Sequence, residues 1–357
     1  MREWKIAALP GDGIGPEVMN EALKVLRVLQ DLDSTFRYHI DLYPWNSEYY
    51  LEHGRMMPEE GLEILQGYDG ILFGAIGDSR VADDVSVWEL IMPIRKSFQQ
   101  YVNFRPVKQL SGIQTPYTSL EKPIDFVIVR ENAEGEYSNS GGHLYGGTED
   151  ELAVQNTMIT RKGVERIARF AFEFARKTER KKVTSATKSN AIVHSMKLWD
   201  SVMDGIASGY EDIALEKAYI DALAAYFVQR PSTFDVVVAS NLFGDILSDL
   251  GSALVGGLGI SPSANINPAG TYPSMFEPVH GSAPDIARTG KANPIAQVWS
   301  TALMLEHFGR EDLSKYILQA ITRVLEKGTV KTQDIGGIAT TVEMGEAIIK
   351  ELYAQSM

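Results

Sequence analysis

The order of hydrophobic patterns along the first hundred residues restricts the fold more than any other feature of this chain. Buried-strand patterns at 4–9, 36–43 and 69–77 alternate with amphipathic helix patterns at 16–29 and 58–66. A strand–helix–strand repeat places consecutive strands parallel, with helices covering the sheet. The sequence therefore predicts an α/β protein with a mainly parallel sheet that is covered on both faces.

The same kinds of pattern continue through the middle and end of the chain. Further strands are predicted at 124–130, 152–160, 181–187 and 234–240. Helices are predicted at 161–180, 214–229, 294–308, 312–326 and 343–354. A long loop is predicted after the stretch "GGLGISPSANI". With 357 residues the chain has room for two domains or for one large α/β domain. The candidate crossing points between two domains lie near residue 100 and at the glycines of 256–259.

Composition excludes several classes of function. A net charge of -13 argues against a nucleic-acid or anionic-membrane partner. The absence of cysteine rules out disulfides, thiolate nucleophiles and Cys-type zinc sites. The N-terminus carries no secretory pattern, and no apolar run reaches the roughly 18 to 20 residues of a membrane span. We therefore expect a cytoplasmic protein.

The loop "GDGIGPEV" at 11–18 follows a strand and precedes a helix, which suggests a dinucleotide-binding turn. Its glycines follow the pattern G-x-G-x-G, whereas the dinucleotide fingerprint needs one more residue before its third glycine. The fingerprint also needs an acidic residue about 20 positions later, and Asp41 comes too late for that role. A tight strand-to-helix turn with proline at the first helical position is the favoured interpretation.

The stretch "NLFGDILSDL" at 241–250 places Asp245 and Asp249 on one side of a helix, one turn apart. Like charges in that arrangement need protonation, a basic side chain or a metal ion, unless the helix face is simply solvated. Oxygen-only ligands suit Mg²⁺ or Mn²⁺. The helix follows the strand "DVVVAS", near the edge of an α/β sheet where ligands bind. Asp221, in "AYIDALAAYF", is either solvent-facing or a third ligand.

Basic side chains near strand ends supply the opposite charge. Arg95, Arg105 and Arg130 could form a bidentate clamp for a dicarboxylate, although each could also be an ordinary ion-pair partner. Lys188 lies just beyond another strand, and Tyr137 follows Arg130 by seven residues. Together with the aspartates, these side chains suit metal-assisted proton abstraction from an acidic substrate.

The motifs as a set resemble the β-decarboxylating dehydrogenases, the family of isopropylmalate, isocitrate, homoisocitrate and tartrate/D-malate dehydrogenases. They cover nearly the whole chain: "GDGIGPEV", "NFRPVK", "VRENAEGEY", "TKSN", "YIDA", "NLFGDILSDL", "FEPVHGSAPDIA" and "TQDIGG". The resemblance implies a homodimer whose subunits have two domains with a shared sheet, not a Rossmann fold. The large cofactor-binding domain would comprise 1–100 plus 258–357. The small domain for substrate, metal and dimerisation would comprise 101–257.

The resemblance also implies roles for the charged residues. Three arginines would bind the substrate carboxylates: Arg95, Arg105 and Arg130. Three aspartates would hold Mn²⁺ or Mg²⁺, one of them donated by the neighbouring subunit: Asp245, Asp249 and Asp221. A monovalent cation such as K⁺ is a further candidate.

Three side chains would move protons in such an enzyme. Lys188, also from the neighbouring subunit, would accept the hydroxyl proton directly or through a water or an aspartate, for which Asp221 is the candidate. The metal would polarise the carbonyl that forms as hydride leaves for NAD⁺. Tyr137 would then protonate the enol left by loss of CO₂.

The resemblance places the cofactor on a different loop from 11–18. The adenosine half would contact "HGSAPDIA" and a following asparagine, through His280, Gly281, Ser282, Ala283, Asp285 and Asn293. Glu277 and Asn190 would approach the nicotinamide. Asp285 suits a free ribose 2′-hydroxyl and would repel a 2′-phosphate, so NAD is expected over NADP.

The stretch "VSVWELIMPIRKSF" at 85–98 separates members of the family. Isopropylmalate enzymes resemble E-x-x-L-L-x-L-R-K there, whereas this chain has Trp88 seven residues before Arg95. The pattern "W…PIR…QYVN" resembles the tartrate/D-malate branch, although Glu89 departs from it. A bulky indole would leave space only for a small substituent, unless Trp88 merely fills the core between domains.

The expected function is therefore NAD- and Mn²⁺- or Mg²⁺-dependent oxidation of a small (2R)-2-hydroxy dicarboxylate with β-decarboxylation. D-Malate would give pyruvate and CO₂, and tartrate is the second candidate substrate. The alternative within the family is 3-isopropylmalate dehydrogenase of leucine biosynthesis. The alternative from another class is a non-catalytic regulatory homologue, which the retained lysine, tyrosine and aspartates disfavour.

Overall fold

The computed structural model describes residues 2–117 and 120–355. It divides into two compact units. Unit 1 consists of three segments of the chain: Met1–Gln100, Lys108–Ser119 and Ser252–Met357. Unit 2 consists of two segments: Tyr101–Val107 and Leu120–Gly251. The assignment of the cofactor to one domain and of substrate, metal and dimerisation to the other stays a prediction.

The sheet of unit 1 has the strand order β2-β1-β3-β12-β11. Its strands are β1 (Glu3–Gly11), β2 (Arg37–Leu42), β3 (Gly70–Ala75), β11 (Pro262–Ile266) and β12 (Ser274–Pro278). The first three and β12 run parallel, as the alternating patterns predict, while β11 is antiparallel to β12. The prediction of a long loop here was wrong, because strands rich in Pro, Ser and Asn carry little hydrophobic signal.

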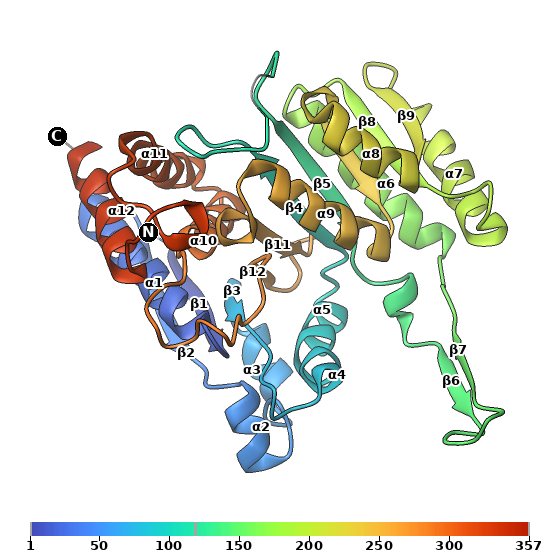
Figure 1. Cartoon of the computed structure of the whole chain (residues 1–357), viewed down its shortest axis with the longest axis horizontal. Helices are drawn as coiled ribbons and strands as arrows, with labels where there is room; N and C mark the ends of the chain where they lie inside the picture. Colours follow the sequence, from blue (N-terminus) through green and yellow to red (C-terminus); the bar gives the residue numbers. More distant parts are fainter. Residues whose placement is uncertain (1, 118–119, 356–357) are drawn as a thin grey trace. The chain divides into compact units, whose positions relative to one another are not determined.

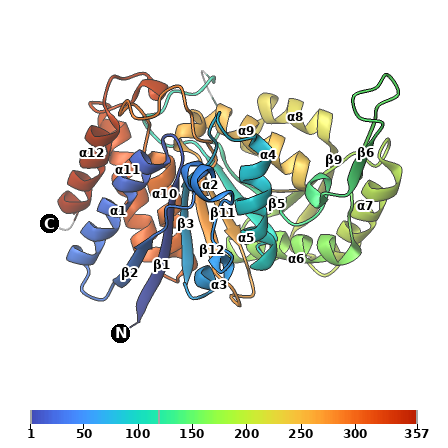
Figure 2. The same ribbon diagram turned by 90° about the horizontal axis from the view of Figure 1, so that it is seen from below.

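Helices cover the two faces of this sheet (Figures 1 and 2). One group comprises α1 (Gly15–Leu32), α10 (Ile295–His307), α11 (Glu311–Lys327) and α12 (Thr341–Gln355). The other comprises α2 (Ser47–His53), α3 (Gly61–Gln66), α4 (Asp83–Ser86) and α5 (Met92–Ser97). Alternate side chains of a strand point to opposite faces, so Ala7, Leu9 and Phe73 pack in one buried cluster with Leu90 and Ile94.

The sheet of unit 2 has the strand order β4-β5-β10-β8-β9. Its strands are β4 (Val102–Lys108), β5 (Asp125–Glu131), β8 (Lys182–Thr187), β9 (Ala214–Tyr219) and β10 (Val236–Ala239). The pairs β5–β10, β10–β8 and β8–β9 are all parallel. The helices are α6 (Arg161–Lys177), α7 (Val193–Ala207), α8 (Ile220–Gln229) and α9 (Asn241–Val255). Figure 2 places α6 and α7 on one side of the strands and α8 and α9 on the other.

Two predicted elements of unit 2 differ from the structure. The helix predicted at 214–229 begins only at Ile220, because "ALEKAY" forms β9 beside β8 although its residues favour helices. The strand predicted at 152–160 is shorter and does not join the parallel sheet. It forms β7 (Leu152–Gln155), which pairs antiparallel with β6 (Gly141–Leu144) in an exposed hairpin (Figure 1).

The glycine loop that follows β1 is packed against other backbone segments. Gly11 has a φ of +73°, and a Cβ there would lie 1.8 Å from the carbonyl oxygen of Ala75. Gly13 has a φ of +57°, and its Cβ would lie 1.9 Å from the carbonyl oxygen of Ser282. Ile14 donates its N–H to the same oxygen at 2.9 Å. The tight-turn interpretation therefore agrees with the structure, and the loop supports the segment that contains Ser282.

Among residues 2–117 and 120–355, no helix is both long and apolar enough to span a bilayer.

Two glycine substitutions separate close packing from backbone conformation. Gly11→Ala should lower the free energy of unfolding by at least about 3 kcal/mol, since it adds a steric clash to an unfavourable φ. Gly54→Ala, also at a positive φ of +69° but with nothing within 4 Å, should cost only about 1 kcal/mol. Urea denaturation of both variants measures the difference, and equal losses would contradict the packing argument.

Candidate active site

The two aspartates lie on α9, directly after β10 in unit 2. Phe243 and Leu247 are buried on the inner face of this helix. Asp245 and Asp249 lie outside that buried stripe, one turn apart, with side chains 34% and 62% exposed. Both carboxylates can therefore reach a ligand, as the sequence pattern predicts.

Two arginines lie beside these carboxylates. Arg130, at the end of β5, donates from Nη1 to Asp245 Oδ1 at 2.6 Å. Arg105 Nη1 lies 3.3 Å from the same oxygen and 3.8 Å from Asp249 Oδ1. Because the arginine side chains are only 4% and 9% exposed, each needs an anionic partner. In this structure basic side chains already neutralise the aspartate pair.

The pKa of Asp249 depends on its partial burial and on the charged side chains around it. Partial desolvation raises the pKa of its carboxyl group, Arg105 opposes that rise, and Asp245 adds to it.

Tyr137, from the 3₁₀ turn Glu136–Ser138, donates its hydroxyl to Asp245 Oδ2 at 3.2 Å. Unit 2 thus brings together five predicted residues, Arg105, Arg130, Tyr137, Asp245 and Asp249.

Lys188 and Asp221 form a second cluster in unit 2. Lys188 Nζ donates to Asp221 Oδ2 at 2.7 Å, and this bond lowers the pKa of Asp221. Lys188 follows β8, while Asp221 begins α8 after β9. Within the described residues, no three His, Asp or Glu side chains lie close enough to hold a metal. The hard oxygen donors of Asp245 and Asp249 suit Mg²⁺ or Mn²⁺, and Asp221 does not join them within the described residues.

Neutral polar residues that sequence reasoning missed support the arginines. Arg105 donates from Nε to Asn103 Oδ1 at 2.6 Å and from Nη1 to Ser248 Oγ. Asn241 accepts two hydrogen bonds from Arg130 on its side-chain oxygen. Asn103, Ser248 and Asn241 lie inside the quoted motifs. Because their side chains are uncharged and common in all parts of proteins, their residue type alone did not indicate a role in the site.

Arg95 lies in unit 1 with a different partner. Its Nη2 donates to Glu277 Oε1 at 2.8 Å. Asn265, which is fully buried in β11, donates to the same oxygen at 2.6 Å. The structure therefore pairs a predicted substrate-binding arginine with a predicted nicotinamide-side glutamate, and Asn265 is a further residue that the sequence did not indicate.

The helix that carries Arg95 is not regular. Between α4 and α5 lies a π turn, Val87–Ile91, in which Met92 donates its N–H to Val87. The extra residue rotates the preceding turn by about 100° relative to Arg95. The ring of Trp88 accordingly lies under Lys96 Nζ, at 5.1 Å. On this shifted period Val87 takes the position of Trp88, almost two turns before Arg95, whereas Ile91 packs against the buried cluster that contains Leu90 and Ile94.

The predicted cofactor loop lies in unit 1 on the N-terminal end of α1. Ala283 packs with Ile14 and Val18, and Ser282 contacts Gly13. Gly281 and Asp285 are exposed. Asn293 donates to Asp334 Oδ2 at 3.0 Å, so Asp334, in "TQDIGG", is a further supporting residue. Asn190, in unit 2, is exposed after β8.

His280 begins this loop. Its Nδ1 lies 2.9 Å from the carbonyl oxygen of Gly281. Its Nε2 is buried, with no hydrogen-bond partner within residues 2–117 and 120–355. Burial lowers the pKa of the imidazole, which keeps it neutral near pH 7.

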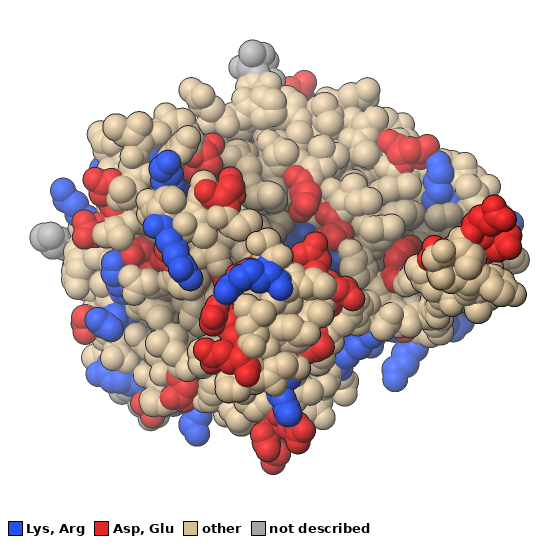
Figure 3. Space-filling view, turned by 60° about the horizontal axis from the view of Figure 1, so that its bottom comes forward, with Lys and Arg blue, Asp and Glu red and all other residues tan. Residues whose placement is uncertain are grey.

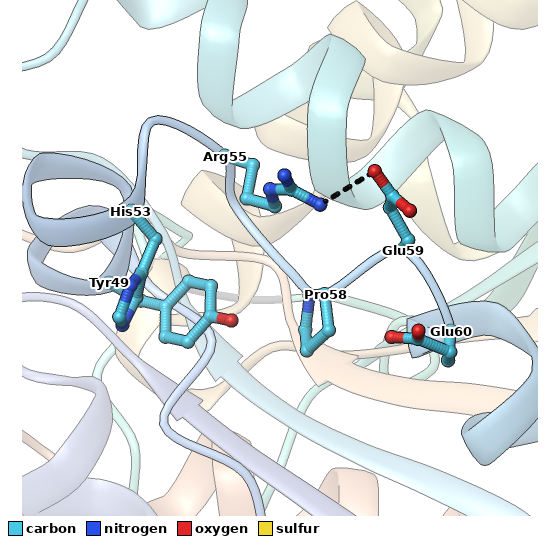
Figure 4. A pocket seen from close by; sticks show the side chains of 6 residues that line it. All are labelled: Tyr49, His53, Arg55, Pro58, Glu59 and Glu60. Carbon is cyan, nitrogen blue, oxygen red and sulfur yellow. Dashed lines mark ion pairs between the residues drawn. The ribbon is translucent and has the colours of Figure 1, made fainter.

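An open pocket of about 310 Å³ in unit 1 lies away from these residues. It is lined by Tyr49, His53, Arg55, Pro58, Glu59 and Glu60. In Figure 4, Arg55 and Glu59 point toward one another and form an ion pair of 3.1 Å. None of the predicted site residues lines it. Figure 3 shows acidic and basic side chains interspersed over one face of the described residues, without an extended basic patch.

Known proteins resemble the chain along nearly its full length. Residues 5–348 match the isocitrate/isopropylmalate dehydrogenase family. The chain belongs to this family. It is 51% identical to the "Probable tartrate dehydrogenase/decarboxylase" of Bacillus subtilis (strain 168), with 99% of both chains covered. It is 48% identical to the "D-malate dehydrogenase [decarboxylating]" of Escherichia coli (strain K12), with 98% of this chain and 99% of that one covered.

A solved structure agrees with this family membership. The crystal structure of isocitrate dehydrogenase from Methylococcus capsulatus matches with a TM-score of 0.89 at 34% identity, covering 98% of this chain and 99% of the other. The expected family, its tartrate/D-malate branch, the fold and the class of oxidative decarboxylase are confirmed. The roles of the individual site residues stay predictions.

Burial of His280 predicts how stability depends on pH. The lowered pKa means that the folded protein takes up this proton less readily than the unfolded chain. Stability is therefore fully present above about pH 6.5 and decreases from there down to the lowered pKa. NMR titration should give His280 a pKa below about 6.5, and His280→Gln should flatten the pH dependence of the urea midpoint. A pKa at or above that value would contradict the burial argument.

Proposed function

We propose that this family member oxidises a small (2R)-2-hydroxy dicarboxylate with NAD and a divalent metal and then removes its β-carboxylate. D-Malate would yield pyruvate and CO₂, and tartrate would be a second substrate. One observation carries the proposal: Asp245 shares its two carboxylate oxygens among Arg105, Arg130 and Tyr137. Two arginines that could bind anions and a tyrosine that could donate a proton therefore surround a carboxylate that could bind a metal ion.

The arginines can exchange one anion for another. Asp245 and Asp249 would hold the divalent ion, Mn²⁺ or Mg²⁺, through hard carboxylate oxygens. Their contacts with Arg105 and Arg130 would then weaken, which leaves guanidinium N–H groups for the substrate carboxylates. Arg95 would bind a further part of the substrate once its bond to Glu277 opens.

The chain's own residues would move the two protons of the reaction. When bound, NAD⁺ would take the hydride from C2, and the divalent ion would stabilise charge on the C2 oxygen. Lys188, paired with Asp221, would accept the proton of the C2 hydroxyl. Cleavage of the bond to the β-carboxylate would release CO₂ and leave its electron pair in an enolate. Tyr137 would then protonate the adjacent carbon.

The cofactor proposal is NAD rather than NADP. Asp285 is exposed on the loop that would carry the adenosine ribose. Its carboxylate suits a ribose hydroxyl and repels a phosphate. His280, Gly281, Ser282, Ala283 and Asn293 would complete the adenosine side, with Glu277 and Asn190 toward the nicotinamide. We place this activity in the cytoplasm.

Two features of unit 2 support a homodimer. The hairpin β6–β7 and its flanks expose large apolar side chains, Leu144, Tyr145, Leu152, Val154 and Met158. Exposed apolar strands of this kind usually mark an interface. In addition, Asp221 does not join Asp245 and Asp249 within one chain. A second chain that donated Lys188 and Asp221 would complete both the base and the metal ligands.

One observation keeps the isopropylmalate alternative open. The π turn moves the partly buried Val87 to the helical position that Trp88 would otherwise hold relative to Arg95, and an apolar side chain there would suit a branched alkyl substituent. Trp88, whose bulk favours a small substituent, is turned toward Lys96. The names of the relatives favour tartrate and D-malate, so these remain the proposed substrates.

A substrate panel tests the proposed function. With NAD⁺ and Mn²⁺, the purified protein should form NADH and CO₂ from D-malate, and more slowly or not at all from 3-isopropylmalate. Parallel assays with NADP⁺, with a chelator and without K⁺ test each cofactor separately. Lys188→Ala should lower kcat by at least about 100-fold, because it removes the base, while Mn²⁺ binding persists. Preference for 3-isopropylmalate would overturn the substrate assignment.

Complementation tests the shared site. Lys188→Ala and Asp245→Ala chains should each be inactive, because one lacks the base and the other a metal ligand. In a mixed dimer one of the two sites would combine the intact residues, so activity should return to about a quarter to a half of the wild-type level, depending on the fraction of mixed dimers. Differently tagged chains allow the mixed dimer to be purified and assayed. Inactive, verified mixed dimers would mean that each chain forms its own complete site.

A further inference from the structure

We propose that Asn241 is a positioning residue. It would fix Arg130 relative to the loop at 134–137, which contains Tyr137. This inference rests on the proposed function, in which Arg130 binds a substrate carboxylate and Tyr137 protonates the enol. Asn241 begins α9, is 2% exposed, and contacts both the arginine and the loop.

The contacts with Arg130 fix one whole edge of the guanidinium. Arg130 Nη2 donates to Asn241 Oδ1 at 2.7 Å. Arg130 Nε donates to the same oxygen at 3.2 Å and to the Asn241 carbonyl oxygen at 2.8 Å. Two parallel bonds to a planar guanidinium restrict its rotation as well as its position. The other edge, through Nη1, is left to Asp245.

Two glycines allow this close arrangement. A Cβ on Gly244 would lie 2.6 Å from Cβ and Cγ of Arg130. A Cβ on Gly135, which has a φ of +81°, would lie 3.2 Å from Asn241 Cβ. The arginine therefore lies directly on the first turn of α9, and the loop after β5 lies against Asn241.

The amide nitrogen of Asn241 makes the connection to the loop. Its Nδ2 donates to the carbonyl oxygen of Glu134 at 3.1 Å. The Glu134 side chain is itself held, because its carboxylate accepts bonds from Thr160 N–H at 2.8 Å and Thr160 Oγ1 at 2.6 Å. Tyr137 follows three residues later, with its hydroxyl on Asp245. The single amide thus joins an anchored loop to the buried arginine.

This connection matters because binding and protonation must coincide in space. Arg130 would set the position of a substrate carboxylate, and Tyr137 would deliver a proton to a neighbouring carbon. Misplacement of about 1 Å between such groups can cost about 100-fold in rate. An amide that contacts both partners keeps their separation constant.

Two substitutions separate the two contacts. Asn241→Ala removes both, and we expect the Kd for D-malate to rise at least about 10-fold and kcat to fall at least about 10-fold. Asn241→Asp retains the acceptor for Arg130 but loses the donor to Glu134. Its Kd should rise less than that of Asn241→Ala, because Arg130 stays in place although the new carboxylate competes for it, while kcat falls about as far as in Asn241→Ala. Calorimetric titration with Mn²⁺ and steady-state assays give the two quantities.

Two further variants guard against a general loss of structure. Asn46→Ala removes another asparagine at a helix start, which accepts a bond from Tyr49 N–H and donates to the carbonyl oxygen of Gly11 at 3.4 Å. It should change stability but not the Kd for D-malate. Gly244→Ala displaces Arg130 from the other side and should raise the Kd at least about 10-fold without removing any hydrogen-bonding group.

The outcomes distinguish this inference from the proposed function. If the wild-type protein neither binds nor oxidises D-malate or tartrate, the proposed function has failed. If the wild-type protein is active, an equal rise in Kd for Asn241→Asp and Asn241→Ala would overturn the positioning role. A kcat of Asn241→Asp that stays at the wild-type level would also overturn it. Asn241 variants that match Asn46→Ala would overturn it as well.

Discussion

The interaction on which the candidate site depends is the neutralisation of two buried guanidinium groups by the carboxylates of α9. A buried charge without a partner is strongly destabilising, and Arg105 and Arg130 are both nearly inaccessible. Asp245 therefore stabilises the fold by neutralising these two arginines, in addition to its proposed role in metal binding. An ion that occupied the aspartates would compete with the arginines, so in the proposed function metal binding would be coupled to release of the arginines toward a substrate.

The topology of unit 2 explains why the proposed machinery divides into two clusters. Parallel strands place their carboxyl ends at one edge of the sheet. Arg130 at the end of β5, Asn241 after β10 and Lys188 after β8 therefore lie along the same edge. Asp221 follows β9, which lies two strands beyond β10, at a distance of roughly 10 Å. A metal–oxygen bond spans only about 2 Å. The strand order thus places Asp221 and Asp245 after strands that are not neighbours, and within the described residues Asp221 does not join Asp245 and Asp249. Assembly is the proposed way to bring a third carboxylate to the pair.

The parts of the fold that could be predicted are those with a strong hydrophobic period. A strong hydrophobic period is present in α1 and in six strands: β1, β2, β3, β5, β8 and β10. β9 has mostly helix-forming residues and becomes a strand only because β8 offers an edge. β11 and β12 are only five residues long and contain several Ser, Pro or Asn residues, which weakens the hydrophobic period. In the site, charged residues at motif positions could be named from the sequence, whereas Asn241 and Asn265 act through neutral amides whose importance depends on contacts between distant segments.

The register of the helix before Arg95 was beyond prediction for a different physical reason. Counting residues assumes an α-helical period, and on that period Trp88 is seven residues, almost two full turns, before Arg95 and shares its face. The π turn at Val87–Ile91 precedes Pro93, which has no N–H to donate to an earlier carbonyl. One inserted residue puts Val87, in place of Trp88, almost two turns before the arginine on the helical period. A substrate preference inferred from spacing assumes a regular helix, so the proposed role of Trp88 depends on the hydrogen-bond shift at this π turn as well as on the size of the indole.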